Sequence, residues 1–174
     1  MKIRTIDHEL EVLDEVLKDL RAVLNKWDAK ADQKSEPEKS PFERAKEGDA
    51  YFYIDGSGDV GWSYEDEGTI DDAFYAIANY CTDRALLEQR ALHETLNRLL
   101  WRYSEEHGGD KQPWDGITPH YFICRAMREG KIVVSFNGYS SGQGVVYFPN
   151  EETAEAAIRD IVEPFLAAHP DFVW

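Results

Sequence analysis

Residues 147–154 read Tyr-Phe-Pro-Asn-Glu-Glu-Thr-Ala, a stretch in which a strand gives way to a helix. Asn150 is a favoured N-cap residue, and the two glutamates after it suit the positive end of a helix dipole. A similar order of residue types occurs at residues 80–83, Tyr-Cys-Thr-Asp, where Thr82 or Asp83 can cap a second helix. Two junctions of this kind predict an α+β protein built from a duplicated unit.

The first predicted unit covers residues 51–117. An apolar strand at residues 51–54 and a second strand at residues 60–64 flank a Gly-rich turn, which is typical of a hairpin. A short strand near residues 74–79 comes next, followed by a long helix that ends at His107-Gly108-Gly109. The predicted inner face of this helix consists of Leu92, Leu96, Leu99 and Tyr103.

The second predicted unit covers residues 118–174 and repeats this order. Strands from Tyr121 and from Ile132 form a hairpin, residues 145–148 form a third strand, and Asn150 begins the last helix. Pro164 is expected to weaken the end of that helix. Its predicted buried face consists of Ala154, Ala157, Ile158, Ile161 and Phe165. Both units, of the form ββ(β)α, are expected to share one antiparallel sheet covered by helices.

Ahead of these units, apolar residues recur at alternating spacings of three and four, which predicts a coiled-coil-like helix over residues 1–30. Val12, Val16 and Val23 widen the stripe, so self-association and docking onto the chain's own core both stay open. Residues 31–50 are polar and hold two prolines, which is typical of a linker. The residues that would carry self-association are Leu10, Leu13, Leu17, Leu20, Leu24 and Trp27.

Charge is the strongest compositional feature, with a formal net charge of −15 in 174 residues. No Lys or Arg occurs from Glu47 through Asp83, and we interpret the acidic side chains of this stretch as an exposed loop that binds a partner. Such a field repels nucleic acid and anionic membranes but attracts a basic protein surface. Solvation and divalent-cation binding remain alternatives for these carboxylates. The candidate partner-binding residues are Asp55, Asp59, Glu65, Asp66, Glu67, Asp71 and Asp72.

The sequence offers no convincing catalytic centre, metal site or cofactor motif. His93-Glu94 resembles the start of a zinc-protease helix motif, but Asn97 stands where the second histidine would be needed. Cys81 and Cys124 have no base spaced beside them, and we expect Cys81 to be a buried core thiol. Of the tryptophans, Trp62 and Trp101 are expected in the core, with Trp114 and Trp174 exposed.

Several motifs resemble small, largely uncharacterised proteins of tailed phages and prophages of Gram-positive bacteria. The matching pieces are residues 48–54, residues 79–82, Trp-Arg-Tyr-Ser-Glu-Glu at 101–106 and the junction at residues 147–154. Cys81 departs from the phenylalanine usual in that group. The resemblance implies a phage or prophage origin and does not indicate a reaction.

We therefore expect a non-enzymatic acidic binding protein that lies in the cytoplasm of a bacterial host, since the chain shows neither a signal-peptide core nor an apolar run of membrane-spanning length. By analogy with anti-CRISPR proteins, the expected partner is a host defence protein that binds nucleic acid, such as a nuclease. Direct binding of nucleic acid or membrane is not expected. The alternative is a phage structural or assembly accessory that oligomerises through the N-terminal helix.

Overall fold

The computed structural model describes residues 17–22 and 40–174. The chain divides into two units, Met1–Ser40 and Pro41–Trp174. The second unit is an α+β fold with two antiparallel sheets, one of two strands and one of three. Among the described helices, none combines the length and the apolar composition needed to cross a bilayer.

The heptad region is described only at residues 17–22, which are helical. The remainder of the helix predicted over residues 1–30 lies outside the described residues. Residues 41–50, which the sequence assigns to a linker, instead belong to the folded unit. Their attachment begins at Pro41, whose carbonyl oxygen accepts hydrogen bonds from the backbone N–H and the hydroxyl of Thr82.

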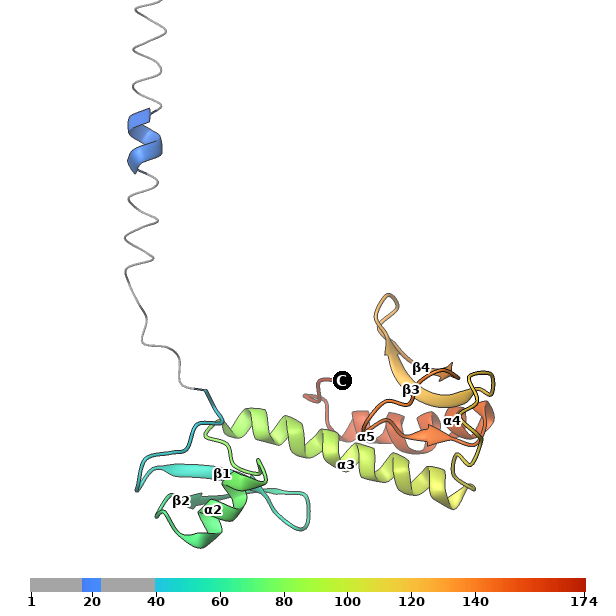
Figure 1. The fold of residues 1–174 in the computed structure, drawn as a ribbon, viewed down its shortest axis with the longest axis horizontal. Coiled ribbons are helices and arrows are strands. Elements are labelled where there is room, and N and C mark those ends of the chain that lie inside the picture. The colour runs from blue at the N-terminus through green and yellow to red at the C-terminus, as the bar shows by residue number, and fades with distance from the viewer. Residues whose placement is uncertain (1–16, 23–39) are drawn as a thin grey trace, which may run out of the picture. The chain divides into compact units, whose positions relative to one another are not determined.

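The first part of the folded unit is a hairpin of β1 (Ala50–Ile54) and β2 (Val60–Tyr64), as the sequence predicts (Figure 1). Gly61 faces Tyr53 across the hairpin, and a Cβ atom at Gly61 would lie 2.8 Å from the Tyr53 ring. The ring therefore lies across the glycine, a packing that helps hold β-register. From there it stacks on Phe74 with a centroid separation of 4.5 Å.

Residues 69–76 form a helix, α2 (Thr69–Ala76), so the prediction of a strand near residues 74–79 is wrong. The helix ends in a Schellman motif, with the N–H of Asn79 donating to Phe74 and that of Ala78 to Tyr75. Ala78 takes the left-handed conformation that this motif requires, with φ 56°. The aromatic pair Phe74 and Tyr75 favours a strand locally, but packing of Phe74 against the hairpin selects the helix.

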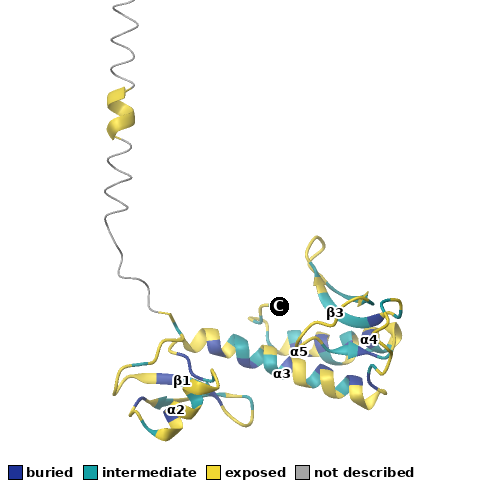
Figure 2. Cartoon of the chain, in the orientation of Figure 1, coloured by how far each residue is buried: buried dark blue, intermediate teal, exposed yellow. Residues whose placement is uncertain are grey.

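The long helix α3 (Arg84–Glu106) begins at the N-cap Asp83, as predicted, and is shared by two cores (Figure 1). Leu87 and Ala91 pack with Ile54 of β1 and with Cys81. Further along, Leu96 and Leu100 pack into the larger core of the second half. Buried residues thus follow one face of α3 along its length (Figure 2).

The second half contains β3 (His120–Ala126), β4 (Lys131–Asn137) and β5 (Tyr147–Phe148), in the spatial order β4-β3-β5. This sheet is separate from the β1–β2 hairpin, so the prediction of one shared sheet is wrong. The duplicated order is nevertheless visible in the pairing. Cys81 bridges to Phe52 of the first hairpin strand, as Phe148 pairs with Tyr121 of β3.

The last helical segment changes register before its proline. It consists of α4 (Glu151–Ala157), which Asn150 caps as predicted, a π-helical turn at Ile158–Val162, and α5 (Glu163–Ala168). Pro164 cannot donate a backbone hydrogen bond, and its ring crowds the preceding turn. The wider π turn precedes it, with the N–H of Glu163 donating to Ile158.

The predicted locations of three tryptophans are wrong. Trp62 and Trp101 are both exposed, because Trp62 lies on the edge strand β2 and Trp101 on the outer side of α3. Trp174, predicted to be exposed, is half-buried because it packs against the larger core. Trp114 is exposed, as predicted.

Candidate functional site

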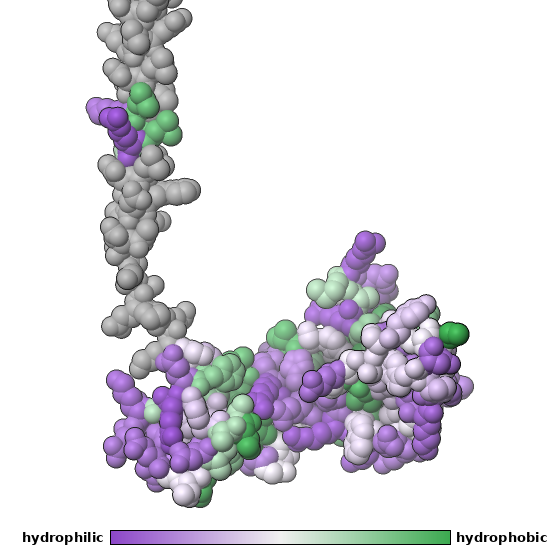
Figure 3. Space-filling view, in the orientation of Figure 1, coloured by the Kyte–Doolittle hydropathy of each residue, from purple (hydrophilic) through white to green (hydrophobic). Residues whose placement is uncertain are grey.

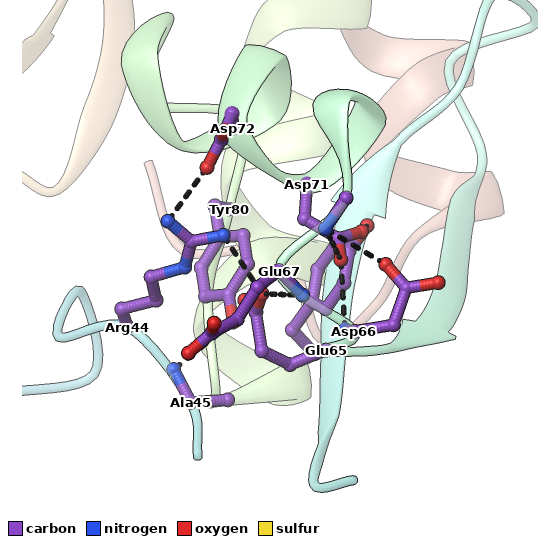
Figure 4. A network of polar contacts seen from close by, with 10 residues as sticks. Arg44, Ala45, Glu65, Asp66, Glu67, Asp71, Asp72 and Tyr80 are labelled. Atoms are coloured by element: carbon purple, nitrogen blue, oxygen red, sulfur yellow. Dashed lines mark hydrogen bonds and ion pairs between the residues drawn. The ribbon is translucent and has the colours of Figure 1, made fainter. Parts of the chain in front are cut away.

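The acidic segment, residues 65–72, is built on two buried tyrosines. Tyr51 of β1 and Tyr80 stack with ring centroids 4.2 Å apart and nearly parallel planes. Each hydroxyl donates to a different carboxylate, Tyr51 to Asp71 at 2.6 Å and Tyr80 to Glu65 at 2.7 Å (Figure 4). Burial and the bond to Glu65 raise the pKa of Tyr80 to about 12, so this phenol remains a donor at neutral pH.

Glu65 is the centre of the network, with 2% of its surface exposed. Its Oε1 atom accepts from the Arg44 guanidinium at 2.8 Å and from the N–H of Glu67 at 2.9 Å, while Oε2 accepts from Tyr80. The hydrogen bond from Arg44 holds the pKa of Glu65 below its usual value, against the effect of burial. Glu65 is therefore a buried charge with three donors.

Asp71 is the second buried carboxylate, at 4% exposure. It accepts from Tyr51 through Oδ1 and from the N–H of Asp66 through Oδ2, at 2.9 Å. These bonds, led by the one from Tyr51, lower the pKa of Asp71 to about 2. Because Asp71 lies in the first turn of α2, its charge also suits the helix dipole.

The prediction that the acidic stretch is an exposed loop is therefore wrong for Glu65 and Asp71. These two side chains point inward, where Asp71 accepts a hydrogen bond from Tyr51 of the hairpin and Glu65 accepts one from Tyr80. Asp66, Glu67 and Asp72 are exposed. Asp72 also forms an ion pair with Arg44, with 2.7 Å between Asp72 Oδ1 and Arg44 Nη1. The bonds of the buried pair (Figure 4) thus hold the backbone of a segment whose three other carboxylates are exposed.

Glu67 has an unusual backbone conformation for its side chain, with φ 58°. A left-handed conformation costs a residue with a Cβ atom about 1 kcal/mol relative to glycine. Its N–H is held by Glu65, and its exposed side chain makes no hydrogen bond with the described residues. The network therefore holds a strained residue whose charge serves no described internal contact.

The other two acidic candidates, Asp55 and Asp59, lie apart from this network, at the turn between β1 and β2. Asp55 Oδ1 accepts from the hydroxyl and the N–H of Ser57, which lowers the pKa of Asp55. Both carboxylates are exposed. Within the described ranges, no three His, Cys, Asp or Glu side chains gather as they would around a metal ion.

Of the residues considered for chemistry, Cys81 is fully buried, which confirms the prediction of a core thiol, and burial raises its pKa. Cys124 is half-buried and His93 exposed. His120 is instead a buried residue at the start of β3. Its Nδ1 atom lies 2.5 Å from Asp110 Oδ2, and the Trp114 ring stacks on the imidazole. The Nε2 atom of His120 has no hydrogen-bond partner among the described residues.

Sequence reasoning missed Arg44, Tyr51 and Tyr80 as parts of the site. Arg44 lies in the stretch that the sequence assigns to a linker, Tyr51 lies in a predicted strand, and Tyr80 lies at a predicted strand-to-helix junction. Two Tyr residues and two acidic residues in a segment without cations are a weak signal, because only the fold brings them together.

Most of the residues predicted to carry self-association lie outside the part of the chain that the structure describes. Leu17 and Leu20 are exposed in their short helix. Leu10, Leu13, Leu24 and Trp27 lie outside the described residues.

Comparisons with family models, curated proteins and solved structures give no significant match to this chain.

Proposed function

We propose that this chain is a non-enzymatic binding protein that contacts a basic protein surface through the acidic segment. The observation that carries the proposal is that some carboxylates of that segment are buried and others are exposed. Glu65 and Asp71 are buried and accept internal hydrogen bonds. Asp66, Glu67 and Asp72 are exposed on the backbone that those bonds hold in place. Rigid presentation of charge lowers the cost of ordering on binding.

Charge and aromatic surface support the same proposal. Arg44 is the cation of this network, and it is already paired with Glu65 and Asp72. The edge strand adds exposed Trp62 and Tyr64, residue types that are enriched in protein interfaces. On the part of the surface formed by β1, β2 and α2, hydrophilic and hydrophobic residues lie side by side (Figure 3).

The partner class that we favour is a nucleic-acid-binding protein, because such proteins carry basic grooves matched to closely spaced anionic groups. The resemblance to phage and prophage proteins extends this proposal to an inhibitor of a host defence nuclease in the bacterial cytoplasm. A second candidate is an assembly accessory that self-associates through the N-terminal helix, which the exposed Leu17 and Leu20 favour.

The test removes the three exposed charges and leaves the buried ones in place. The variant Asp66→Asn, Glu67→Gln and Asp72→Asn keeps side-chain size and loses at most a surface ion pair with Arg44. Its affinity for a ten-residue arginine peptide, measured by fluorescence anisotropy at an ionic strength of about 0.1 M, is expected to fall about tenfold. Most of the loss should be in the association rate, since long-range attraction speeds encounter.

The matched control removes the same number of charges elsewhere, by Glu129→Gln, Glu155→Gln and Glu163→Gln, all exposed. It is expected to change the affinity less than about twofold, because charges beyond the Debye length, roughly 10 Å, are screened. An equal loss in both variants would show that net charge alone attracts the peptide. Unchanged binding in the first variant, together with stable self-association of the intact chain, would favour the second candidate.

A further inference from the structure

The outer side of β2 is an open sheet edge. Phe52 exchanges backbone hydrogen bonds with Cys81, so the backbone groups of Phe52 point away from β2. Phe52 lies opposite Trp62 in the hairpin register, and in an antiparallel pair such residues both direct their backbone groups outward. The N–H and C=O groups of Trp62 therefore face the free side of β2, as do those of Val60 and Tyr64 two residues away.

The two edges of the hairpin are treated differently by the fold. On the β1 side, Cys81 satisfies the outward groups of Phe52, and the side-chain amide of Asn79 bonds the N–H and C=O of Ile54. On the β2 side, no described strand is paired. An unpaired edge of this kind is the surface to which extended peptides add as a further strand.

Side chains beside this edge suit an interface. Trp62 and Tyr64 point to the same side of the hairpin, are 56% and 58% exposed, and meet edge to face at 5.2 Å. Buried aromatic anchors contribute much of the binding energy in protein interfaces. An added strand that runs along β2 would cover both rings.

Carboxylates flank the edge at both ends. Beyond Tyr64 lie the exposed Asp66 and Glu67. Beyond Val60 lies a cleft of about 500 Å³, lined in part by Asp59, Glu88 and Asp171. The cation of this cleft that contacts Glu88 is Arg84, at 2.7 Å. A strand laid on β2 would therefore meet Asp66 and Glu67 at one end, and at the other end Asp59 and Asp171 beside the Arg84–Glu88 ion pair.

We infer that β2 receives an extended, basic segment of the partner protein as an additional strand. The inference rests on the proposed function and names its recognition element. A second copy of this chain is a poorer occupant. Antiparallel pairing of two β2 strands would set Asp59 of one copy near Asp66 and Glu67 of the other, and facing like charges destabilise such pairs.

The test uses the full chain and a ten-residue peptide of alternating lysine and valine. The comparison peptide has the same sequence and charge but a fully N-methylated backbone, which cannot donate hydrogen bonds. The unmodified peptide is expected to bind about tenfold more tightly, the equivalent of roughly 1.4 kcal/mol. Equal affinity of the two peptides would overturn the inference and leave the proposed function standing, whereas no affinity for either would overturn both.

Two variants localise the effect. Trp62→Pro removes one of the outward N–H groups while leaving the β1–β2 ladder intact, since proline is tolerated at such edge positions, and it should reduce the difference in affinity between the two peptides. The variant Asp66→Asn, Glu67→Gln and Asp72→Asn should weaken both peptides by the same factor. If Trp62→Pro fails to fold, the comparison of the two peptides on the unaltered chain still decides. Dimerisation of the unaltered chain that Trp62→Pro abolishes would overturn the inference in favour of a second copy.

Discussion

Replacing Glu65 by glutamine is expected to destabilise the folded unit by about 3 kcal/mol. All three groups that contact this carboxylate are donors, namely the Arg44 guanidinium, the Tyr80 hydroxyl and the N–H of Glu67. A carboxylate only accepts, so it matches them, whereas an amide turns its own NH₂ group toward at least one donor. Arg44 also loses the charge of one of its two carboxylate partners and keeps its ion pair with Asp72.

The matched control is Glu67→Gln, the same chemical change two residues away at an exposed side chain. We expect the control to change the free energy of unfolding by less than about 0.5 kcal/mol. Urea unfolding followed by tryptophan fluorescence measures both variants. Equal, small effects would show that the Glu65 network does not hold the acidic segment in place.

Acid is expected to weaken the same network. In the folded chain the pKa of Glu65 is lowered and that of Asp71 is about 2, whereas unfolded carboxyls titrate near pH 4. A carboxyl with a lowered pKa contributes stability that is present above the unfolded pKa and is lost as the pH falls through the folded pKa. For Asp71 this loss falls between about pH 4 and pH 2.

Protonation of carboxyls elsewhere also has an effect of opposite sign, because it relieves repulsion in a chain of net charge −15. The informative quantity is therefore the difference in urea midpoint between the unaltered chain and Asp71→Asn, followed across that window. The difference should shrink as the pH falls. Tyr51→Phe removes the hydroxyl that lowers the Asp71 pKa most and should give a similar, smaller effect. A difference that stays constant from pH 5 to pH 2 would contradict this account.

Local patterns in the sequence predict much of the fold. The N-caps Asp83 and Asn150 and the two hairpins follow from capping and periodicity. Of the predicted inner face of α3, Leu96 is buried, whereas Leu92, Leu99 and Tyr103 are only partly buried. The buried side of the last helix departs from the pattern at Val162, since the π turn before Pro164 inserts an extra residue into the helical repeat. The spacing of apolar residues along the last helix does not predict that shift.

The sequence predicts the negative charge of the candidate site but not the contacts within it. The absence of cations from residue 47 to residue 83 locates the acidic segment, but burial of Glu65 and Asp71 depends on partners distant in sequence. Tyr80 is 15 residues from Glu65, and Arg44 is 21 residues away. Local periodicity carries no information about such pairs, and helix α2 was missed for the same reason.

The central claim is that the partner binds at the acidic segment and the neighbouring edge strand. Hydrogen–deuterium exchange of the full chain, with and without the alternating lysine and valine peptide, tests it most directly. The account predicts slowed exchange concentrated in residues 60–72, with little change in α4 or in the β3–β4 hairpin. Slowed exchange in α4 or β3–β4 while residues 60–72 remain unaffected would contradict it.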